Sequence, residues 1–407
     1  MTLPTDSDRA GGRAPLGFLI FLSMMTSVIA LTIDAILPAL DAVSKDLQFE
    51  EASDRQLIVL IVFAGIGLGQ PVFGPLADAI GRRRTAAIGW ALYIVGAIIA
   101  MTASSLTIML AGRLLQGIGA SGPRVVATAI VRDLYSGRPM ARIMSLIMTV
   151  FMLVPMLAPL IGQGLEAVAG WRAIFTLYIA MAVLCLVWHL TSVPETLTPE
   201  NVRPLSFRPL LEAFVEVLRT RKTMCYTMGS AAIFSAFAAF LAGSQQIYEE
   251  IYGLGEWFPA LFALTGAIFA AAQFTNSRLV MTFGMRRICR IAASMVVVGA
   301  LSLYVVGQLW FDGAPPFWAF FLGLVPIFIG SAMMFSNLTA LALEPMGHIA
   351  GTASAVVMSV STLAATPVGM FFAQQIDDNV LPILTAFALM GAVSLAFILA
   401  ADRGPET

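Results

Sequence analysis

Asp34 is the residue of this chain whose type and position most directly suggest chemistry. It lies within a long apolar run at 16–40, where an ionised carboxylate has a high free-energy cost relative to water. Such a group is rarely retained in hydrocarbon without a task, and the usual task is to carry a proton or hold a cation during transport. A carboxylate at this position therefore predicts that the protein moves a solute or an ion across a membrane.

A guanidinium, that of Arg113, is expected at the depth of this carboxylate. Asp34 lies six residues, roughly 9 Å, from the outer end of its run, and Arg113 lies seven residues, roughly 10 Å, from the outer end of the run at 106–130. Burial raises the pKa of a carboxylate and a nearby guanidinium lowers it, so a changing distance between the two can load and release a proton. We expect Asp34 and Arg113 to form a proton-coupling pair; the alternative is a static ion pair between two helices.

Arg124 adds a second positive charge to the same helix. It lies eleven residues after Arg113, three helical turns along, and so shares one face with it. Unless Arg124 snorkels to the cytoplasm or pairs with Asp133, the cavity carries excess positive charge, which favours anionic, zwitterionic or electron-rich neutral solutes over strong cations. A snorkelling or bracing Arg is the alternative. The side chains expected to line a substrate cavity are Arg124, Gln116, Met148, Phe234, Phe237, Gln245 and Asn337.

The composition identifies the elements that must position these residues. The chain is 59% hydrophobic and 12% charged, whereas a soluble domain is about one-quarter charged. About twelve apolar runs reach the roughly 20 residues that cross a bilayer. They lie at 16–40, 57–77, 86–104, 106–130, 143–165, 172–192, 224–247, 257–275, 288–309, 317–340, 351–374 and 381–401. Runs of this length, interrupted by Gly and Pro, predict an all-α integral membrane protein with twelve transmembrane helices.

The basic residues predict the orientation. Eighteen of the 23 Lys and Arg residues fall in segments on the side of the amino terminus, and three fall in the loops on the other side. Positive residues concentrate in cytoplasmic loops, so both termini are expected in the cytoplasm, at a bacterial inner membrane.

A polar stretch after the sixth run divides the chain into halves that repeat. We expect a cytoplasmic tail at 1–15, a six-helix bundle at 16–192, a linker at 193–223, a second six-helix bundle at 224–401 and a tail at 402–407. Residues 210–218 are interpreted either as an amphipathic helix on the inner membrane surface or as a linker with a helical turn. An offset of 203 residues aligns Gly81 with Gly284, which indicates two bundles related by a pseudo-twofold axis.

Several motifs resemble those of the major facilitator superfamily. Residues 74–83 (Gly-Pro-Leu-Ala-Asp-Ala-Ile-Gly-Arg-Arg) resemble its signature loop, with Ala where Arg is usual. Residues 113–117 (Arg-Leu-Leu-Gln-Gly) resemble its fourth-helix motif, and residues 158–163 (Ala-Pro-Leu-Ile-Gly-Gln) its fifth-helix antiporter motif, with two glycines replaced. Residues 33–40 and 130–135 are similar to the Bcr/CflA subgroup of drug:proton antiporters.

The resemblance implies roles for two of these motifs. Gly74, Asp78, Gly81 and Arg82 are expected to form a conformational latch that stabilises an outward-open state, and a purely topogenic basic loop is the alternative. The second-half loop has Met281 in place of the Asp, so the latch is expected to be one-sided. Pro155, Pro159 and Gly162 are expected to bend the fifth helix or pack it tightly and so seal a leak path, with ordinary packing as the alternative.

The function implied by the resemblance is proton-coupled export of small amphiphilic drugs or metabolites by alternating access. Its partners are then a small-molecule substrate, protons and the lipid bilayer. A proton symporter that imports a specific solute, and a membrane sensor or assembly partner that transports nothing, are the alternatives. No nucleophile–base pair, metal-ligand cluster or Walker loop stands out, and the three cysteines are scattered, so we expect no enzyme, cofactor or metal. A monomer that binds no nucleic acid is expected.

Overall fold

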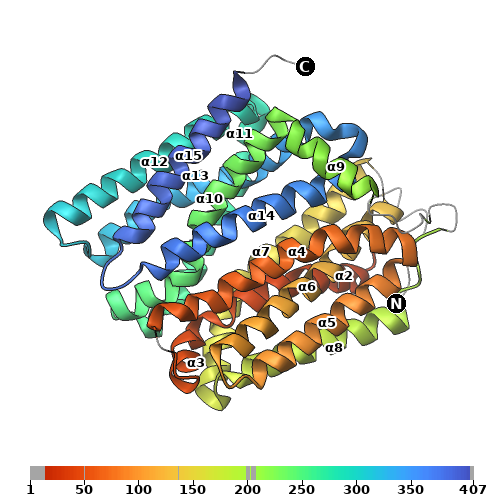
Figure 1. The fold of residues 1–407 in the computed structure, drawn as a ribbon, viewed down its shortest axis with the longest axis horizontal. Coiled ribbons are helices and arrows are strands. Elements are labelled where there is room, and N and C mark those ends of the chain that lie inside the picture. The colour runs from red at the N-terminus through yellow and green to blue at the C-terminus, as the bar shows by residue number, and fades with distance from the viewer. Residues whose placement is uncertain (1–13, 50, 136, 199–201, 203–207, 404–407) are drawn as a thin grey trace. The chain divides into compact units, whose positions relative to one another are not determined.

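The computed structural model describes residues 14–49, 51–135, 137–198, 202 and 208–403. Over these residues the secondary structure consists of helices, without strands (Figure 1). Twelve of the described helices are long and apolar enough to cross a membrane. The prediction of an all-α protein with twelve membrane-spanning helices is confirmed.

The helices follow one another with short connections. In the first half they are α2 (Leu16–Asp34), α3 (Leu40–Asp46), α4 (Leu57–Ile80), α5 (Arg82–Met101), α6 (Leu106–Leu134), α7 (Gly137–Ala169) and α8 (Arg172–Ser192). The second half has α9 (Arg208–Arg219), α10 (Arg221–Gln246), α11 (Phe258–Phe283), α12 (Met285–Trp310), α13 (Phe317–Leu343), α14 (Ala350–Gln374) and α15 (Leu381–Asp402). Single turns lie at η1 (Leu37–Ala39), η2 (Ala52–Gln56), η4 (Ile247–Ile251), η5 (Gly255–Trp257) and η6 (Glu344–Ile349). Helix α9 shows that the predicted linker contains a three-turn helix.

The chain forms two compact units. Unit 1 is drawn from Met1–Phe49 and Ile61–Leu210, and unit 2 from Glu50–Leu60 and Leu211–Thr407. The main division thus falls within the predicted linker. The segment Glu50–Leu60 belongs to unit 2, although helix α4, which begins at Leu57, continues into unit 1.

The first span is interrupted directly after Asp34. Helix α2 ends at Asp34, and η1 and α3 carry the candidate span on to Asp46. Pro38 has no backbone N–H, so it cannot donate the hydrogen bond that would continue the helix from the Asp34 carbonyl. Asp34 therefore lies twelve residues before the end of the candidate span, which continues beyond the apolar run at 16–40.

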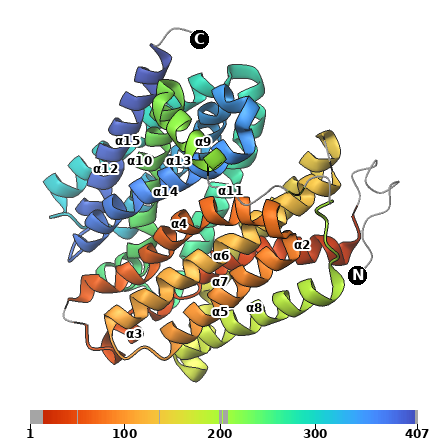
Figure 2. The ribbon, with the colours of Figure 1, turned by 45° about the vertical axis from the view of Figure 1, so that its right-hand side comes forward.

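Glycines allow α5 and α6 to pack backbone against backbone. A Cβ atom added to Gly96 would lie 2.4 Å from the Gln116 nitrogen, and one added to Gly119 would lie 2.3 Å from the Tyr93 nitrogen. The two helices run side by side in both views (Figures 1 and 2). Small residues permit such a close approach between membrane helices. This packing fixes the position of α6, the helix that carries Arg113 and Arg124.

The internal repeat is visible in the backbone. Gly81, before α5, has φ of +95° and ψ of 160°, and Gly284, before α12, has φ of +75° and ψ of 153°. This left-handed region is readily adopted by Gly and rarely by other residues. The same turn thus recurs in both units at the predicted offset.

Candidate functional site

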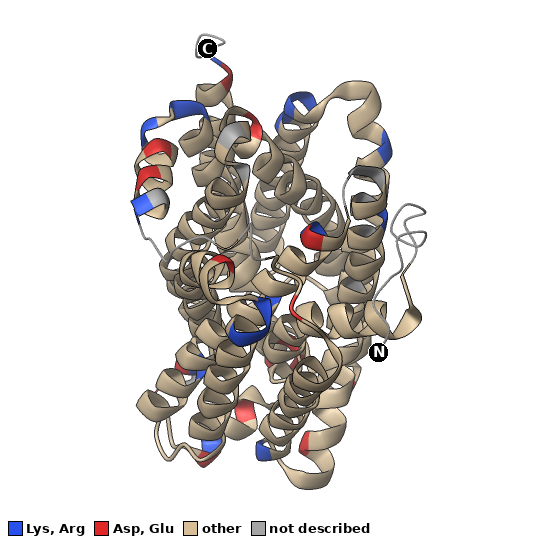
Figure 3. Cartoon of the chain, turned by 90° about the vertical axis from the view of Figure 1, so that its right-hand side faces the viewer, with Lys and Arg blue, Asp and Glu red and all other residues tan. Residues whose placement is uncertain are grey.

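Asp34 is a buried carboxylate in a molecule with few charges along its helices. Figure 3 shows most helical turns without a charged residue. Only 3% of the surface of Asp34 is exposed. Among the described residues, no hydrogen bond or ion pair to its side chain is found. An ionised carboxylate without a partner is costly in such surroundings, so this position is unusual for a purely structural acid.

Arg113 is directed at helix α2, but not at this carboxylate. Its Nη2 donates to the carbonyl oxygen of Thr32 at 2.8 Å, and its Nη1 donates to Oε1 of Gln116 at 2.8 Å. The guanidinium carbon also lies 5.8 Å from the centre of the Phe175 ring. The contact with Thr32 places Arg113 two residues from Asp34 along α2, in agreement with the expected similar depth. A static ion pair between Asp34 and Arg113 is absent from the contacts of the described residues.

Thr32 is the centre of a hydrogen-bond network that the sequence did not reveal. Its Oγ1 donates to the Val28 carbonyl at 2.6 Å. Because a hydroxyl has one proton, the Tyr93 hydroxyl, at 2.6 Å, must be the donor to Thr32 Oγ1. The Tyr178 hydroxyl donates to the Thr32 carbonyl at 3.3 Å. These bonds connect α2 with α5 and α8 immediately before Asp34.

Helix α7 makes backbone contact with α2 beside Asp34. A Cβ atom added to Gly162 would lie 1.9 Å from the carbonyl oxygen of Ala35, so only Gly allows this approach. Pro155 and Pro159 lie within the same helix. The tight helix contact, which was one of the two structures predicted for this motif, is therefore present at Gly162.

Arg124 is enclosed by protein, although part of its surface remains accessible. In the described part of the chain, its guanidinium has no hydrogen bond or ion pair. The predicted alternative partner, Asp133, is occupied by Arg82, whose Nε and Nη2 bind its two carboxylate oxygens at 2.8 and 3.1 Å. The alternative considered for Arg124, pairing with Asp133, is therefore not observed.

The residues of the predicted latch belong to a larger ion-pair network. Besides Asp133, Arg82 binds Asp78, with Nη1 donating to Oδ1 at 2.7 Å. Glu195 accepts hydrogen bonds from the backbone nitrogens of Arg82 at 2.9 Å and Arg83 at 3.1 Å. These nitrogens lie in the first turn of α5, where the helix dipole favours a negative charge. The sequence motif indicated Asp78 and Arg82 but not Glu195, which lies more than 100 positions later.

The two glycines of this motif differ in their surroundings. A Cβ atom added to Gly81 would lie 2.4 Å from Oε2 of Glu195, and its positive φ already favours Gly. No atom lies within 4 Å of the corresponding position at Gly74. Gly81 is thus required by the network, whereas no close contact explains Gly74.

Phe234 and Phe237 belong to an aromatic cluster within unit 2. Phe237 lies 5.0 Å from Phe269 of α11 and 5.6 Å from Phe335 of α13, measured between ring centres, and Phe234 lies 5.9 Å from Phe335. All four side chains are partly exposed. The cluster offers an adaptable apolar surface of the kind expected to contact a ligand.

The other predicted cavity residues are less accessible, with one exception. Gln116 and Gln245 are buried, and Asn337 is buried in a pair with Asn276, to whose Oδ1 it donates at 2.9 Å. Met148 is the exception, with 38% of its surface exposed. Asn337 connects α13 with α11, whereas Gln116 accepts from Arg113 three residues away and Gln245 donates to Glu249 four residues away.

The sequence model that describes the Major Facilitator Superfamily matches residues 16–369. This chain belongs to that superfamily. It is 27% identical over 388 residues to a bicyclomycin resistance protein homolog of Haemophilus influenzae, with 94% of both chains covered. It is 26% identical over 364 residues to multidrug resistance protein D of Escherichia coli, with 86% of both chains covered.

A solved structure has a similar fold. The crystal structure of a D-xylose-proton symporter matches with a TM-score of 0.75 at 16% identity and covers 94% of this chain and 97% of that chain. With its twelve candidate spans, this superfamily member is a multi-pass membrane transporter and not an enzyme.

Within unit 2, this transporter has an ion pair between a buried Arg and an exposed Glu. Arg55 is 2% exposed, and its Nη1 and Nη2 bind the carboxylate of Glu250 at 2.5 and 2.7 Å. Beside it, Nε2 of Gln56 donates to Oε1 of Gln246 at 2.7 Å. The sequence placed Arg55 in an outer loop and gave no partner, because Glu250 lies 195 residues later.

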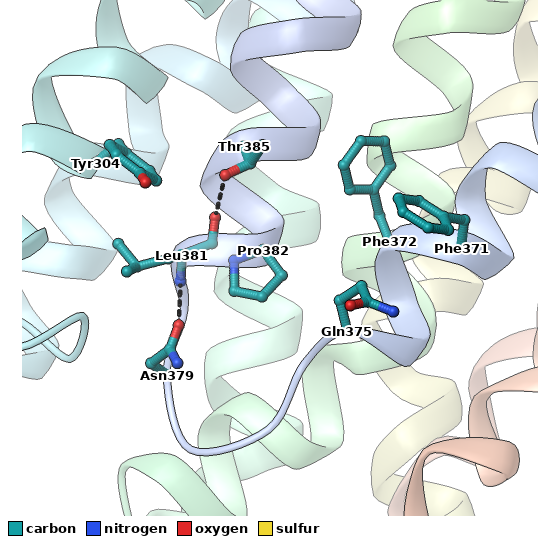
Figure 4. A pocket seen from close by; sticks show the side chains of 8 residues that line it. All are labelled: Tyr304, Phe371, Phe372, Gln375, Asn379, Leu381, Pro382 and Thr385. Carbon is teal, nitrogen blue, oxygen red and sulfur yellow. Dashed lines mark hydrogen bonds between the residues drawn. The ribbon is translucent and has the colours of Figure 1, made fainter.

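A pocket of about 300 Å³ opens on unit 2 of the transporter (Figure 4). Its lining residues are Tyr304, Phe371, Phe372, Gln375, Asn379, Leu381, Pro382 and Thr385. Asn379 already accepts from the Leu381 nitrogen at 3.0 Å, and Thr385 donates to the Leu381 carbonyl at 2.8 Å. The lining has no acidic or basic side chain and none of the predicted cavity residues, so we do not assign it to transport chemistry.

Proposed function

We propose that this transporter exports small amphiphilic drugs or metabolites in exchange for protons, by alternating access. It acts as a monomer in a bacterial inner membrane, with both termini in the cytoplasm. The observation that carries the proposal is Asp34, a buried carboxylate without a described partner at the point where α2 ends. The names of the two relatives, which refer to bicyclomycin and multidrug resistance, support export of drugs.

Asp34 is the proton carrier in this proposal. Its carboxylate binds a proton while it is enclosed, because an unpaired charge is costly there, and releases the proton when water or a positive charge reaches it. The interrupted helix after Asp34 gives this end of α2 freedom to change its environment, since Pro38 removes a backbone hydrogen bond. Proton binding and solute binding then alternate.

Arg113 tunes this step without holding the carboxylate. Its bond to the Thr32 carbonyl fixes a positive charge near Asp34 and leaves the carboxylate free to change partners. A small movement of α2 relative to α6 therefore changes the electrostatic stabilisation of the ionised acid. In the latch, Asp78 and Arg82 stabilise one conformation of unit 1 and do not bind solute.

The first test replaces Asp34 by Asn, which keeps the size of the side chain and removes its charge. Everted vesicles with an imposed pH gradient are screened for solutes that cause proton release, and accumulation of the active solutes is then measured. We expect D34N to be inserted normally and to lose pH-driven accumulation. Full pH-driven accumulation by D34N would refute the role of Asp34, and a solute-induced proton movement of opposite sign would identify an importer.

A further inference from the structure

Helix α6 carries two guanidinium groups on one face, and they differ in how they are used. Arg113 is fully buried and bonded to Thr32 and Gln116. Arg124, three turns further along, remains partly accessible and has no described partner. The guanidinium of Arg113 is therefore bonded within the protein, whereas that of Arg124 is available to a ligand.

One of the two structural explanations for Arg124, pairing with Asp133, does not apply here. Asp133 is engaged by Arg82 through both carboxylate oxygens and by the hydroxyl of Thr196 at 3.0 Å. Arg124 also lies ten residues before the end of α6 at Leu134, roughly 15 Å along the axis. This distance is longer than an Arg side chain, so the guanidinium does not reach the carboxyl-terminal end of the helix.

A negatively charged ligand would compensate the charge of Arg124. A guanidinium does not lose its proton in proteins, and a charge within a membrane span requires a partner or water. Its planar set of donors matches the two oxygens of a carboxylate. Part of the Arg124 side chain remains accessible, and this part is the surface that a ligand would contact.

We propose that Arg124 binds the carboxylate of an amphiphilic solute, so that the transporter prefers carboxylate-bearing compounds to their neutral or cationic counterparts. This inference rests on the proposed function, since the ligand is taken to be the transported solute. The bound carboxylate compensates Arg124 in the loaded state.

Binding is measured on the full chain in lipid nanodiscs, without a pH gradient. The first pair of probes is chloramphenicol and its succinate ester, which carries a carboxylate. The second set is a panel of amphiphiles, and each amphiphile is prepared as a carboxylate, a primary amide and a primary amine. A charge-assisted hydrogen-bonded pair predicts that carboxylates bind about tenfold more tightly than their amides. We expect R124Q to remove this difference while leaving amide affinity unchanged, and R124K to retain part of it.

The control is R278Q, which removes an exposed guanidinium that lies over the Phe274 ring in unit 2. It should keep the carboxylate preference. The inference is overturned if no carboxylate in the panel binds wild-type protein more tightly than its amide, or if R124Q keeps the preference. If R124Q does not fold, a wild-type series without a carboxylate preference still overturns the inference, and R124K then tests the role of Arg124. Binding is measured without a proton gradient. If the protein prefers carboxylates but moves no protons, that result contradicts the proposed function and leaves the inference about Arg124 intact.

Discussion

At the scale of single residues, the site depends on how polar groups are satisfied around Asp34. Arg113 and Tyr178 both donate to the carbonyl of Thr32, while Tyr93 donates to its hydroxyl. The polar groups around the carboxylate are thus bonded to the residue two positions before it. Asp34 itself has no partner among the described residues, as the proposed proton carrier requires.

Replacing Thr32 by Val tests this network. The change removes the acceptor of the buried Tyr93 hydroxyl, and an unsatisfied buried polar group costs about 1–3 kcal/mol. We expect T32V to lower the thermal unfolding temperature of the purified transporter and to weaken proton coupling. The matched control is T26V on the same helix, since Thr26 bonds only to backbone carbonyls of α2. Equal destabilisation by the two variants would contradict the role of Thr32.

At the scale of elements, backbone contacts between helices place the site. Helix α5 packs on α6 through glycines. Helix α7 contacts α2 where Gly162 approaches Ala35, the residue that follows Asp34 in the sequence. Such contacts leave no room for a methyl group. We therefore infer that the fifth-helix motif acts on Asp34 through α2, by fixing how closely the two helices approach.

The variant G162A tests this contact. Its methyl group would overlap the Ala35 carbonyl, and overpacking of this kind costs about 1–3 kcal/mol. We expect lower stability in thermal unfolding and an increased proton leak in proteoliposomes. G164A provides the control on the same helix, because no atom lies within 4 Å of its added Cβ position. A proton leak as large in G164A as in G162A would rule out a specific role for the contact.

At the scale of the whole molecule, the chain consists of two units that share a backbone signature. The left-handed glycine turn recurs before α5 and α12, and each unit has acidic and basic partners near it. In unit 2, Arg290 binds Asp402 at 2.8 Å, so the second half has a charge cluster although its loop lacks the Asp of the first. The segment before α4 belongs to unit 2 and is held there by Arg55.

A double-mutant cycle on Arg55 and Glu250 measures the strength of this attachment. Arg55 is buried and binds Glu250 through two nitrogens, so we expect a coupling free energy of about 1–3 kcal/mol from thermal unfolding of R55A, E250A and the double variant. The reference cycle uses Arg172 and Asp46, a pair at 2.6 Å with both side chains about half exposed. Exposed pairs contribute about 0–1 kcal/mol. Coupling of Arg55 and Glu250 no larger than the reference would show that the attachment is weak.

The sequence by itself determined the class of protein, the number of spans and the internal repeat. These properties depend on hydrophobicity and on local patterns such as the loop at 74–83, and both are readable along the chain. It also identified Asp34, because an acid within an apolar run is costly whatever its partners. Residue counts along the two helices also predicted that Asp34 and Arg113 lie at similar depth. In the structure, Arg113 bonds to Thr32, two residues before Asp34.

Only the tertiary structure decided how these residues are paired. Arg113 binds a backbone carbonyl instead of Asp34, Asp133 binds Arg82 instead of Arg124, and the partners of Arg82 include a Glu more than 100 positions away. Pairing of this kind depends on which groups meet when helices pack, and spacing along one helix does not contain that information. As a consequence, Arg113 is bonded within the protein, whereas Arg124, on the same face of α6, has no partner among the described residues.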